Sequence, residues 1–222
     1  MGHPSDKRPL LMVSNHINYI DILALAAYVP ARFTPKVEIG RWPVIGYICK
    51  LTGAIFIERK ANKIKDAKQP LHDAIRQGEI ISLFPESTTN NGVHMLPFKS
   101  SFFSLAEEAD KDQPLYIQPV AMTYTRINRL PVDSTQWPLI AWYGDMDMVP
   151  HLFKFLAFGS VKMELHFLEP VTIAEFQDRK ALAQHCHDVI ENTIDDIRER
   201  PWVKKTYKKR TSWIPISFKS KS

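Results

Sequence analysis

The chain has 222 residues, of which 45% are hydrophobic and 24% are charged, so it can bury a sizeable core and is typical of one globular domain. Its two cysteines, Cys49 and Cys186, lie far apart and form neither a metal-binding spacing nor a disulfide framework, which excludes a disulfide-rich secreted scaffold. The net charge is +5, but residues 201–222 hold seven cations and no acid, which leaves residues 1–200 at −2.

The predicted elements alternate between short apolar strands and helical segments. In chain order, we expect strands at 10–13, 32–34, 53–59, 80–84, 115–124, 139–143 and 161–168, and helices at 18–28, 42–51, 61–77, 100–109, 149–158 and 179–200. Pro119 lies inside one of these strands, which indicates a bulge or an edge strand there. The alternation predicts one α/β domain, residues 1–200, in which a largely parallel central sheet is flanked by helices. Residues 201–222 form a separate basic, aromatic tail.

A histidine stands where the first strand leads into the first helix. His16 follows this strand closely, and Asp21 lies five positions further on. Open α/β sheets place their chemistry at such strand ends. A histidine there can act as a general base if a carboxylate fixes its ring and tautomer. The same residues also fit an ordinary helix start, with Asn18 as the N-cap and Asp21 in a capping box, and the spacing alone does not decide between the two interpretations.

Two further strand ends carry charged groups. Glu58 and Arg59 close the strand at 53–59, and Glu86 lies in the loop after the strand at 80–84. Because the carboxyl ends of parallel strands share one edge, we expect these segments to converge with His16 on one crevice. The Arg59 guanidinium suits a phosphate or a carboxylate, although a surface ion pair is the alternative. Three hydroxyl groups in the loop can add anion contacts or belong to a solvated turn, namely those of Ser87, Thr88 and Thr89.

Four blocks, in this order, resemble the glycerolipid acyltransferase family, whose best-known members are the 1-acyl-glycerol-3-phosphate acyltransferases. The blocks are Asn-His-x4-Asp at Asn15, His16 and Asp21; Gly-x-Ile-Phe-Ile-(Asp/Glu)-Arg at Gly53, Glu58 and Arg59; Phe-Pro-Glu-Gly-Thr at Phe84, Pro85, Glu86, Ser87 and Thr88; and an apolar strand with a central proline at Pro119. The ordered set is specific and spans about half of the chain. Weaker similarity through 142–146 resembles α-proteobacterial members. The resemblance implies the glycerolipid acyltransferase fold.

The resemblance also implies a reaction and a role for each block. His16 is expected to deprotonate the acceptor hydroxyl, and Asp21 to orient the imidazole. The hydroxyl oxygen then attacks the thioester carbonyl of acyl-CoA or acyl carrier protein, with no covalent acyl-enzyme, no metal and no further cofactor. Five residues are expected to hold the polar acceptor, with Lys36 as a phosphate-binding lysine; they are Lys36, Arg59, Glu86, Ser87 and Thr88.

The acceptor implied first is 1-acyl-glycerol-3-phosphate (lysophosphatidate), which would be converted to phosphatidate in phospholipid biosynthesis. Two positions depart from the family pattern. Ser87 stands where the family usually has glycine, which predicts a differently shaped loop, and Thr89 stands where it often has arginine. Relatives that lack this arginine include acyltransferases that complete ornithine lipids, whose acceptor has no phosphate. Lyso-ornithine lipid O-acylation is therefore the alternative, and an inactive membrane-binding homologue is the second alternative.

Membrane contact is expected to come from the C-terminal tail. No signal peptide is recognisable, and the longest apolar stretch, 139–158, is broken by charged residues, so no membrane-spanning helix is predicted. In the tail, four aromatic residues are interleaved with the seven cations, which suits an anionic bilayer, although nucleic acid and a solvated end are alternatives. Together with the acyltransferase blocks, this predicts a peripheral protein at the cytoplasmic face of the bacterial inner membrane, with no nucleic-acid partner.

Overall fold

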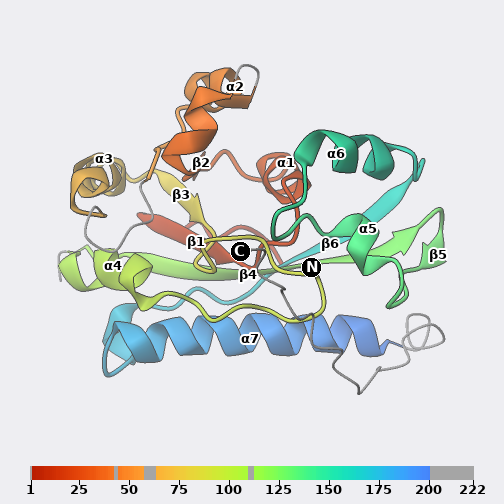
Figure 1. Ribbon diagram of the computed structural model, residues 1–222. Helices are drawn as coiled ribbons and strands as arrows, with labels where there is room; N and C mark the ends of the chain where they lie inside the picture. The colour runs from red at the N-terminus through yellow and green to blue at the C-terminus, as the bar shows by residue number, and fades with distance from the viewer. Residues whose placement is uncertain (1, 43–44, 58–63, 110–112, 201–222) are drawn as a thin grey trace, which may run out of the picture.

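A central sheet forms the middle of the computed structural model, which describes residues 2–42, 45–57, 64–109 and 113–200 (Figure 1). Five strands follow in the order β2 (Arg32–Phe33), β3 (Ile80–Leu83), β1 (Leu10–Ser14), β4 (Tyr116–Ile127) and β5 (Leu130–Pro131), and β6 (Val161–Phe167) also pairs with β4. β2, β3, β1 and β4 are mutually parallel, whereas β5 and β6 run antiparallel to β4. The prediction of an α/β domain with a largely parallel sheet is confirmed.

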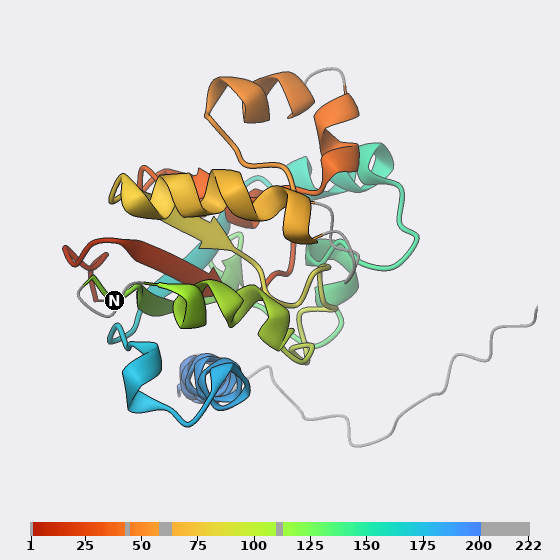
Figure 2. The same cartoon turned by 90° about the vertical axis from the view of Figure 1, so that its left-hand side faces the viewer.

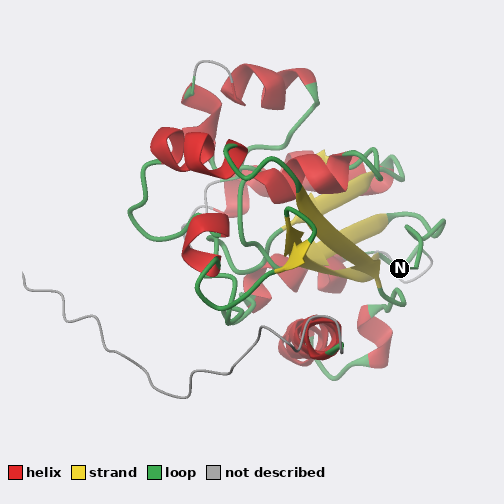
Figure 3. Cartoon of the chain, turned by 90° about the vertical axis from the view of Figure 1, so that its right-hand side faces the viewer, coloured by secondary structure: helices red, strands yellow, loops and turns green. Residues whose placement is uncertain are grey.

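Helices cover both faces of this sheet. α7 (Arg179–Glu199) lies below it in Figure 1, whereas α1 (Ile20–Ala26), α2 (Ile45–Leu51) and α6 (Met148–Leu156) lie above it. Figure 2 shows α7 nearly end-on and α2 projecting from the opposite side, and Figure 3 shows the strands between them. The remaining helical segments are α3 (Ile64–Arg76), α4 (Ser104–Glu108), α5 (Trp137–Ile140) and the short 3-10 turns η1 (Val37–Arg41), η2 (Ser100–Phe103) and η3 (Ile173–Glu175).

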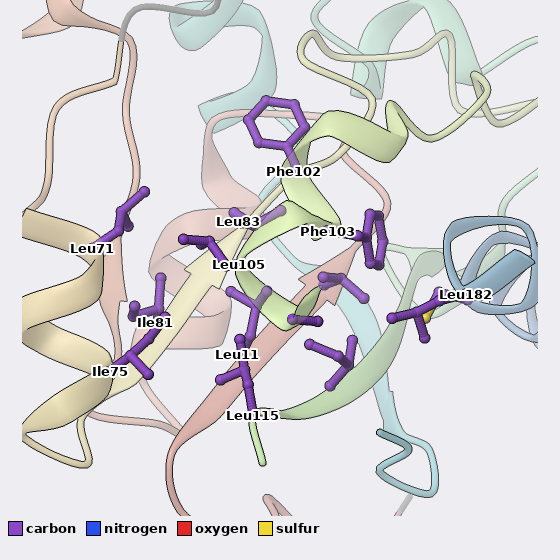
Figure 4. Packing of buried hydrophobic residues seen from close by; sticks show 14 of the residues in the cluster. Leu11, Leu71, Ile75, Ile81, Leu83, Phe102, Phe103, Leu105, Leu115 and Leu182 are labelled. Atoms are coloured by element: carbon purple, nitrogen blue, oxygen red, sulfur yellow. The ribbon is translucent and has the colours of Figure 1, made fainter. Parts of the chain in front are cut away.

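β1 is an unbroken apolar run because its side chains are buried on both faces of the sheet. Its residues 10–13 are 0% exposed, and successive side chains point to opposite faces of the sheet. Leu11 joins Ile81 in a cluster that α3, α4 and α7 complete (Figure 4). Leu10 joins a second cluster, on the face that carries Leu25 of α1. Because both faces of β1 are filled, the chain that leaves its end is held in a defined direction.

Pro119 lies in the interior strand β4, so the edge-strand interpretation is wrong. Residues 168–171, which follow β6, pair irregularly with β4 next to Pro119. The backbone N–H of Leu168 donates to Pro119 O at 2.9 Å, and Ile117 and Val171 exchange backbone hydrogen bonds at 2.7 and 2.9 Å. The partner segment therefore has one extra residue between these two contacts, which is a bulge. The irregularity falls where the proline has no N–H to donate.

The predicted strand at 139–143 is wrong. Trp137–Ile140 forms α5, with Pro138 in the first turn, where a missing N–H is tolerated. Trp137 and Ile140 are buried by helix packing instead of strand pairing. The N–H of Trp142 donates to Ile17 O at 3.0 Å, so this segment packs directly against the chain next to His16.

The segment at 53–57 is extended beside β2 but forms only an isolated bridge, between Ile57 and Lys36. The N–H of Ile55 donates to Phe33 O at 2.9 Å, which continues the parallel arrangement. Glu58 and Arg59 lie outside the described residues, as does the tail at 201–222.

One hairpin was not predicted from the sequence. β4 turns into β5 through Asn128 and Arg129, whose φ angles of 48° and 69° are those of a two-residue type I′ turn. Asparagine at the first position was an available signal. Over the part of the chain that the structure describes, none of the helices has the length and apolarity needed to cross a bilayer.

Candidate active site

The segment between β1 and α1 is fixed by the side chain of Asn15. Its Nδ2 donates to Met122 O at 2.8 Å, and its Oδ1 accepts from Met122 N at 2.9 Å. The amide thus imitates one more peptide of β1 and extends its pairing with β4. As a result, the residue that follows, His16, leaves the sheet at a fixed point.

The imidazole of His16 is held by the carboxylate of Asp21. The distance from Nδ1 to Oδ2 is 3.0 Å, and the side chains are 12% and 0% exposed, respectively. The same Oδ2 accepts the backbone N–H groups of Ile17 at 2.6 Å and Asn18 at 2.8 Å. Because these N–H groups can only donate, Oδ2 is an acceptor, and we assign the imidazole proton to Nδ1. Nε2 then carries a lone pair and can accept a proton.

The carboxylate of Asp21 also holds the turn that leads into α1. Asn18 Oδ1 accepts from the N–H of Ile20 at 3.2 Å, and Asn18 N donates to Asp21. Tyr19 is the N-cap of α1 and has no side-chain cap, so the prediction of Asn18 as the N-cap is wrong; the two contacts instead close the turn just before the helix. One carboxylate therefore both helps to begin α1 and orients the imidazole.

Tyr124 of β4 supplies the fourth contact of Asp21. Its hydroxyl donates to Oδ1 at 2.8 Å. Burial, and next the charge of Asp21, raise the pKa of Tyr124 well above its ordinary value, so the phenol keeps its proton and remains a donor. Tyr124 was not predicted as a site residue. In an apolar strand, a tyrosine whose hydroxyl donates to a buried acceptor cannot be distinguished by sequence from a tyrosine that only packs.

Glu86 organises the loop after β3. It is 3% exposed. Its Oε1 accepts from the backbone N of His16 at 2.8 Å, Oε2 accepts from the backbone N of Leu96 at 2.8 Å, and Asn90 Nδ2 donates to both oxygens at 3.0 and 2.9 Å. Burial raises the pKa of Glu86 to about 7 despite these donors. The carboxylate thus ties the ends of β1 and β3 together from inside the protein.

One aromatic contact and one backbone hydrogen bond complete the attachment of His16. The ring of Phe84 stacks on the imidazole, with centroids 4.0 Å apart and planes 15° apart. The N–H of Asn90 donates to His16 O at 2.7 Å. The predicted convergence of the segments after β1 and β3 is therefore observed.

The loop keeps a left-handed turn although Ser87 replaces the usual glycine. The φ angle of Ser87 is 66°, in a region that glycine adopts without strain. Serine thus stands in a backbone conformation typical of glycine, and the expected change in the shape of the loop stays a prediction.

The other predicted site residues differ in their exposure and in their distance along the chain from the Glu86 loop. Thr88 and Lys36 are exposed, whereas Thr89 is only 8% exposed. Pro85 is buried beside Glu86, and Gly53 lies at the end of the turn that follows α2. Of these, Thr88 is on the Glu86 loop, while Lys36 lies beside Ile57, just before the undescribed Glu58 and Arg59.

A clamp from α7 holds the far end of the loop. Arg198 Nη1 donates to Val93 O at 3.0 Å, Nη2 donates to Gly92 O, and the guanidinium lies 4.8 Å from the centre of the Trp137 ring. Gly92 has a φ of 78°, and a Cβ there would meet the Trp137 ring. A cavity of about 280 Å³ separates the loop from α7, and Asn15 is among its lining residues. Sequence spacing offered no signal for this long-range cluster.

Comparisons with known proteins identify the family. The family model "Acyltransferase" matches residues 3–123.

This chain belongs to the acyltransferase family.

Among its relatives, it is 32% identical over 203 residues to a lyso-ornithine lipid O-acyltransferase of Rhizobium meliloti (strain 1021), an alignment that covers 88% of this chain and 68% of that protein. It is 36% identical over 180 residues to a protein of the same name from Brucella abortus (strain 2308), covering 79% and 67%. It is 28% identical over 200 residues to a 1-acyl-sn-glycerol-3-phosphate acyltransferase of Neisseria gonorrhoeae, covering 88% and 74%.

The fold also has a solved counterpart. The crystal structure of the 1-acyl-sn-glycerophosphate acyltransferase from Thermotoga maritima superposes with a TM-score of 0.60 at 19% identity, and the match covers 89% of this chain and 69% of that one. The glycerolipid acyltransferase resemblance and its fold are confirmed.

The raised pKa of Glu86 predicts a pH dependence of stability. In the folded protein the pKa of the Glu86 carboxyl is about 7, whereas the ordinary pKa of a glutamate is 4.5. Because the folded state binds the proton more tightly than the unfolded chain does, the free energy of unfolding should fall as the pH rises from 4.5 to 7. Urea unfolding at a series of pH values measures this slope. Carboxyl ¹³C NMR, assigned with Glu86→Gln, should show one glutamate titrating near neutrality; if every glutamate titrates in the ordinary acidic range, the assignment is wrong.

Removing the Tyr124 hydroxyl should destabilise the fold measurably. Tyr124→Phe leaves Asp21 Oδ1 buried without its donor, and hydrogen bonds to charged groups contribute about 1.5–3 kcal/mol. Tyr28→Phe is the matched control, because that tyrosine is 68% exposed, and it should change the free energy of unfolding by less than about 0.5 kcal/mol. Equal stability of both variants in urea would contradict the proposed contact.

Proposed function

We propose that this chain transfers a fatty acyl group from an acyl thioester to the hydroxyl group of lyso-ornithine lipid. The observation that carries the chemistry is the His16–Asp21 pair, with Nδ1 committed to the carboxylate at 3.0 Å and Nε2 left to accept a proton. The acceptor is supported by the names of the relatives that are more than 30% identical over most of the chain. They favour the alternative of the sequence analysis over its first choice, lysophosphatidate.

The proposed reaction is a direct acyl transfer. His16 Nε2 takes the proton of the acceptor hydroxyl. At the same time the oxygen of this hydroxyl attacks the thioester carbonyl carbon. The carbon–sulfur bond then breaks, and the thiolate leaves with the proton that the imidazole returns. Asp21 keeps the ring in one orientation and stabilises the imidazolium that forms between these steps. Acyl-CoA and acyl carrier protein both fit as donors in this scheme.

The loop after β3 supports an acceptor without phosphate. Residues 85–92 contain no cation, and Thr89 is a neutral side chain with 8% exposure. The one carboxylate of the loop, Glu86, is committed to protein donors, so we assign it a positioning role instead of contact with the acceptor. Thr88, which is exposed on the same loop, remains our candidate for contact with the acceptor.

Lysophosphatidate is the second candidate acceptor. The Neisseria relatives support it, since their name states that substrate. In that case Lys36 and Arg59 are the cations that we would assign to the phosphate. The intact His16–Asp21 geometry argues against an inactive homologue, because a binding module does not need an oriented imidazole. We place the enzyme at a membrane surface, peripherally, on the cytoplasmic face where acyl thioesters are available.

An acceptor panel tests both the reaction and the acceptor. Purified protein with labelled acyl-CoA or acyl carrier protein should acylate lyso-ornithine lipid faster than lysophosphatidate, as followed by lipid mass spectrometry. His16→Ala should lower the rate by about 10²–10⁴-fold, the contribution typical of a general base. The matched control is His72→Ala, which removes another histidine paired with a carboxylate, 2.9 Å from Glu108 and on the surface between α3 and α4. A clear preference for lysophosphatidate would replace the acceptor, and full activity of His16→Ala would refute the mechanism.

A further inference from the structure

Helix α6 exposes an apolar stripe, although its inner side already packs against the protein. His151 and Phe155 face inward, with exposures of 3% and 8%. Val149, Phe153 and Leu156 face outward, with exposures of 57%, 70% and 64%. The outward residues follow the i, i+4, i+7 spacing of one helical stripe. A surface helix normally has polar residues on its outer face, so this exposed apolar stripe is a departure from the usual pattern.

The first helix extends this apolar surface toward the site. Tyr19, just before α1, bonds through its hydroxyl to His151 Nδ1 of α6 at 3.0 Å, and the two rings meet edge to face at 5.7 Å. Leu23 lies one helical turn beyond Tyr19 and is 62% exposed. The outer surfaces of α1 and α6 are therefore neighbours, and they adjoin the segment that carries His16.

Helix α2 presents a similar stripe on the same side of the sheet. Tyr47 and Leu51 lie four residues apart and are 63% and 69% exposed. α2, α1 and α6 all lie on the side opposite α7 (Figures 1 and 2). We call this surface the apolar face and define it by one set of exposed side chains, namely Leu23, Tyr47, Leu51, Val149, Phe153 and Leu156.

The charges on these helices have one sign. Within the described part of α1, α2 and α6, the exposed charged side chains are Lys50 and Lys154, while Asp21 is fully buried. Aromatic and aliphatic side chains flanked by lysines are typical of surfaces that enter the headgroup region of an anionic bilayer. Exposed acidic residues lie next to these helices, at Glu38, Asp145 and Asp147, so the positive charge that favours an anionic bilayer is that of the helices themselves.

We propose that the apolar face docks onto an anionic lipid bilayer and so holds the His16 segment at the lipid surface. The proposal rests on the proposed function for its purpose, because a lysolipid acceptor resides in a membrane. Its physical basis is independent of turnover: six exposed apolar side chains, two cations, and direct contacts from α6 to Tyr19. It differs from the tail-based contact expected from the sequence, and the two can be separated by mutation.

Vesicle sedimentation with the full chain tests the docking surface. The double variant Phe153→Ser with Leu156→Ser removes two side chains whose insertion should each strengthen binding severalfold, so affinity for vesicles of phosphatidylcholine and phosphatidylglycerol should fall at least about tenfold. Leu130→Ser is the matched control, because Leu130 is 68% exposed but lies on β5, outside the apolar face. All of these side chains are exposed, and urea unfolding checks that each variant keeps its stability.

A second pair of variants tests the electrostatic part. Lys50→Gln with Lys154→Gln should weaken binding to anionic vesicles and reduce its sensitivity to salt, while binding to pure phosphatidylcholine stays unchanged. Unchanged anionic-vesicle binding in both this pair and the α6 pair would overturn the proposal. So would an equilibrium-sedimentation dimer that the α6 pair dissociates, since the face would then be an interface between two copies.

Turnover measurements separate this proposal from the proposed function. The α6 pair should slow acylation of an acceptor held in vesicles but leave acylation of a monomeric, short-chain acceptor unchanged. Loss of both activities would contradict a role confined to docking. If the wild-type chain binds vesicles through α6 but acylates no acceptor, the docking proposal holds and the proposed function fails.

Discussion

The arrangement of the site depends on the buried carboxylate of Asp21. An isolated charge with 0% exposure would be strongly unfavourable, but here its oxygens accept from an imidazole, two backbone N–H groups and a phenol. The backbone donors are those of Ile17 and Asn18, in the turn that leads from β1 into α1, which begins at Ile20 with Tyr19 as its N-cap. The start of the helix and the orientation of His16 therefore rely on the same group, and neither can change without the other.

The strand order explains how residues distant in sequence meet at this carboxylate. β1 lies between β3 and β4, so the segment after β1 has the Glu86 loop on one side and Tyr124 on the other. Asn15 attaches that segment to β4, and Glu86 attaches it to the loop. The imidazole is thus held by rigid neighbours on two sides, while the helices above the sheet present an apolar surface beside it.

Local patterns in the sequence predicted the strands around the site, because burial on both sheet faces leaves a local signature. The roles of His16 and Asp21 followed from the family resemblance and not from their spacing alone. Local patterns did not predict partners that only the tertiary fold brings together, such as Tyr124, Asn90 and Arg198. The apolar run at 139–143 was misassigned, since short apolar segments can be buried equally well by a helix, and α5 is buried that way. The residue type at Ser87 did not indicate a left-handed backbone, yet its φ angle is 66°.

The most direct test is the tautomer of His16, measured by ¹⁵N NMR of the imidazole in the whole chain, in its neutral form. We predict a proton on Nδ1, bonded to Asp21, and an unprotonated Nε2, and in Asp21→Asn this single tautomer should be lost. A proton resident on Nε2 in the wild-type protein, or an identical spectrum in Asp21→Asn, would contradict the claim that the buried carboxylate prepares this histidine to accept a proton.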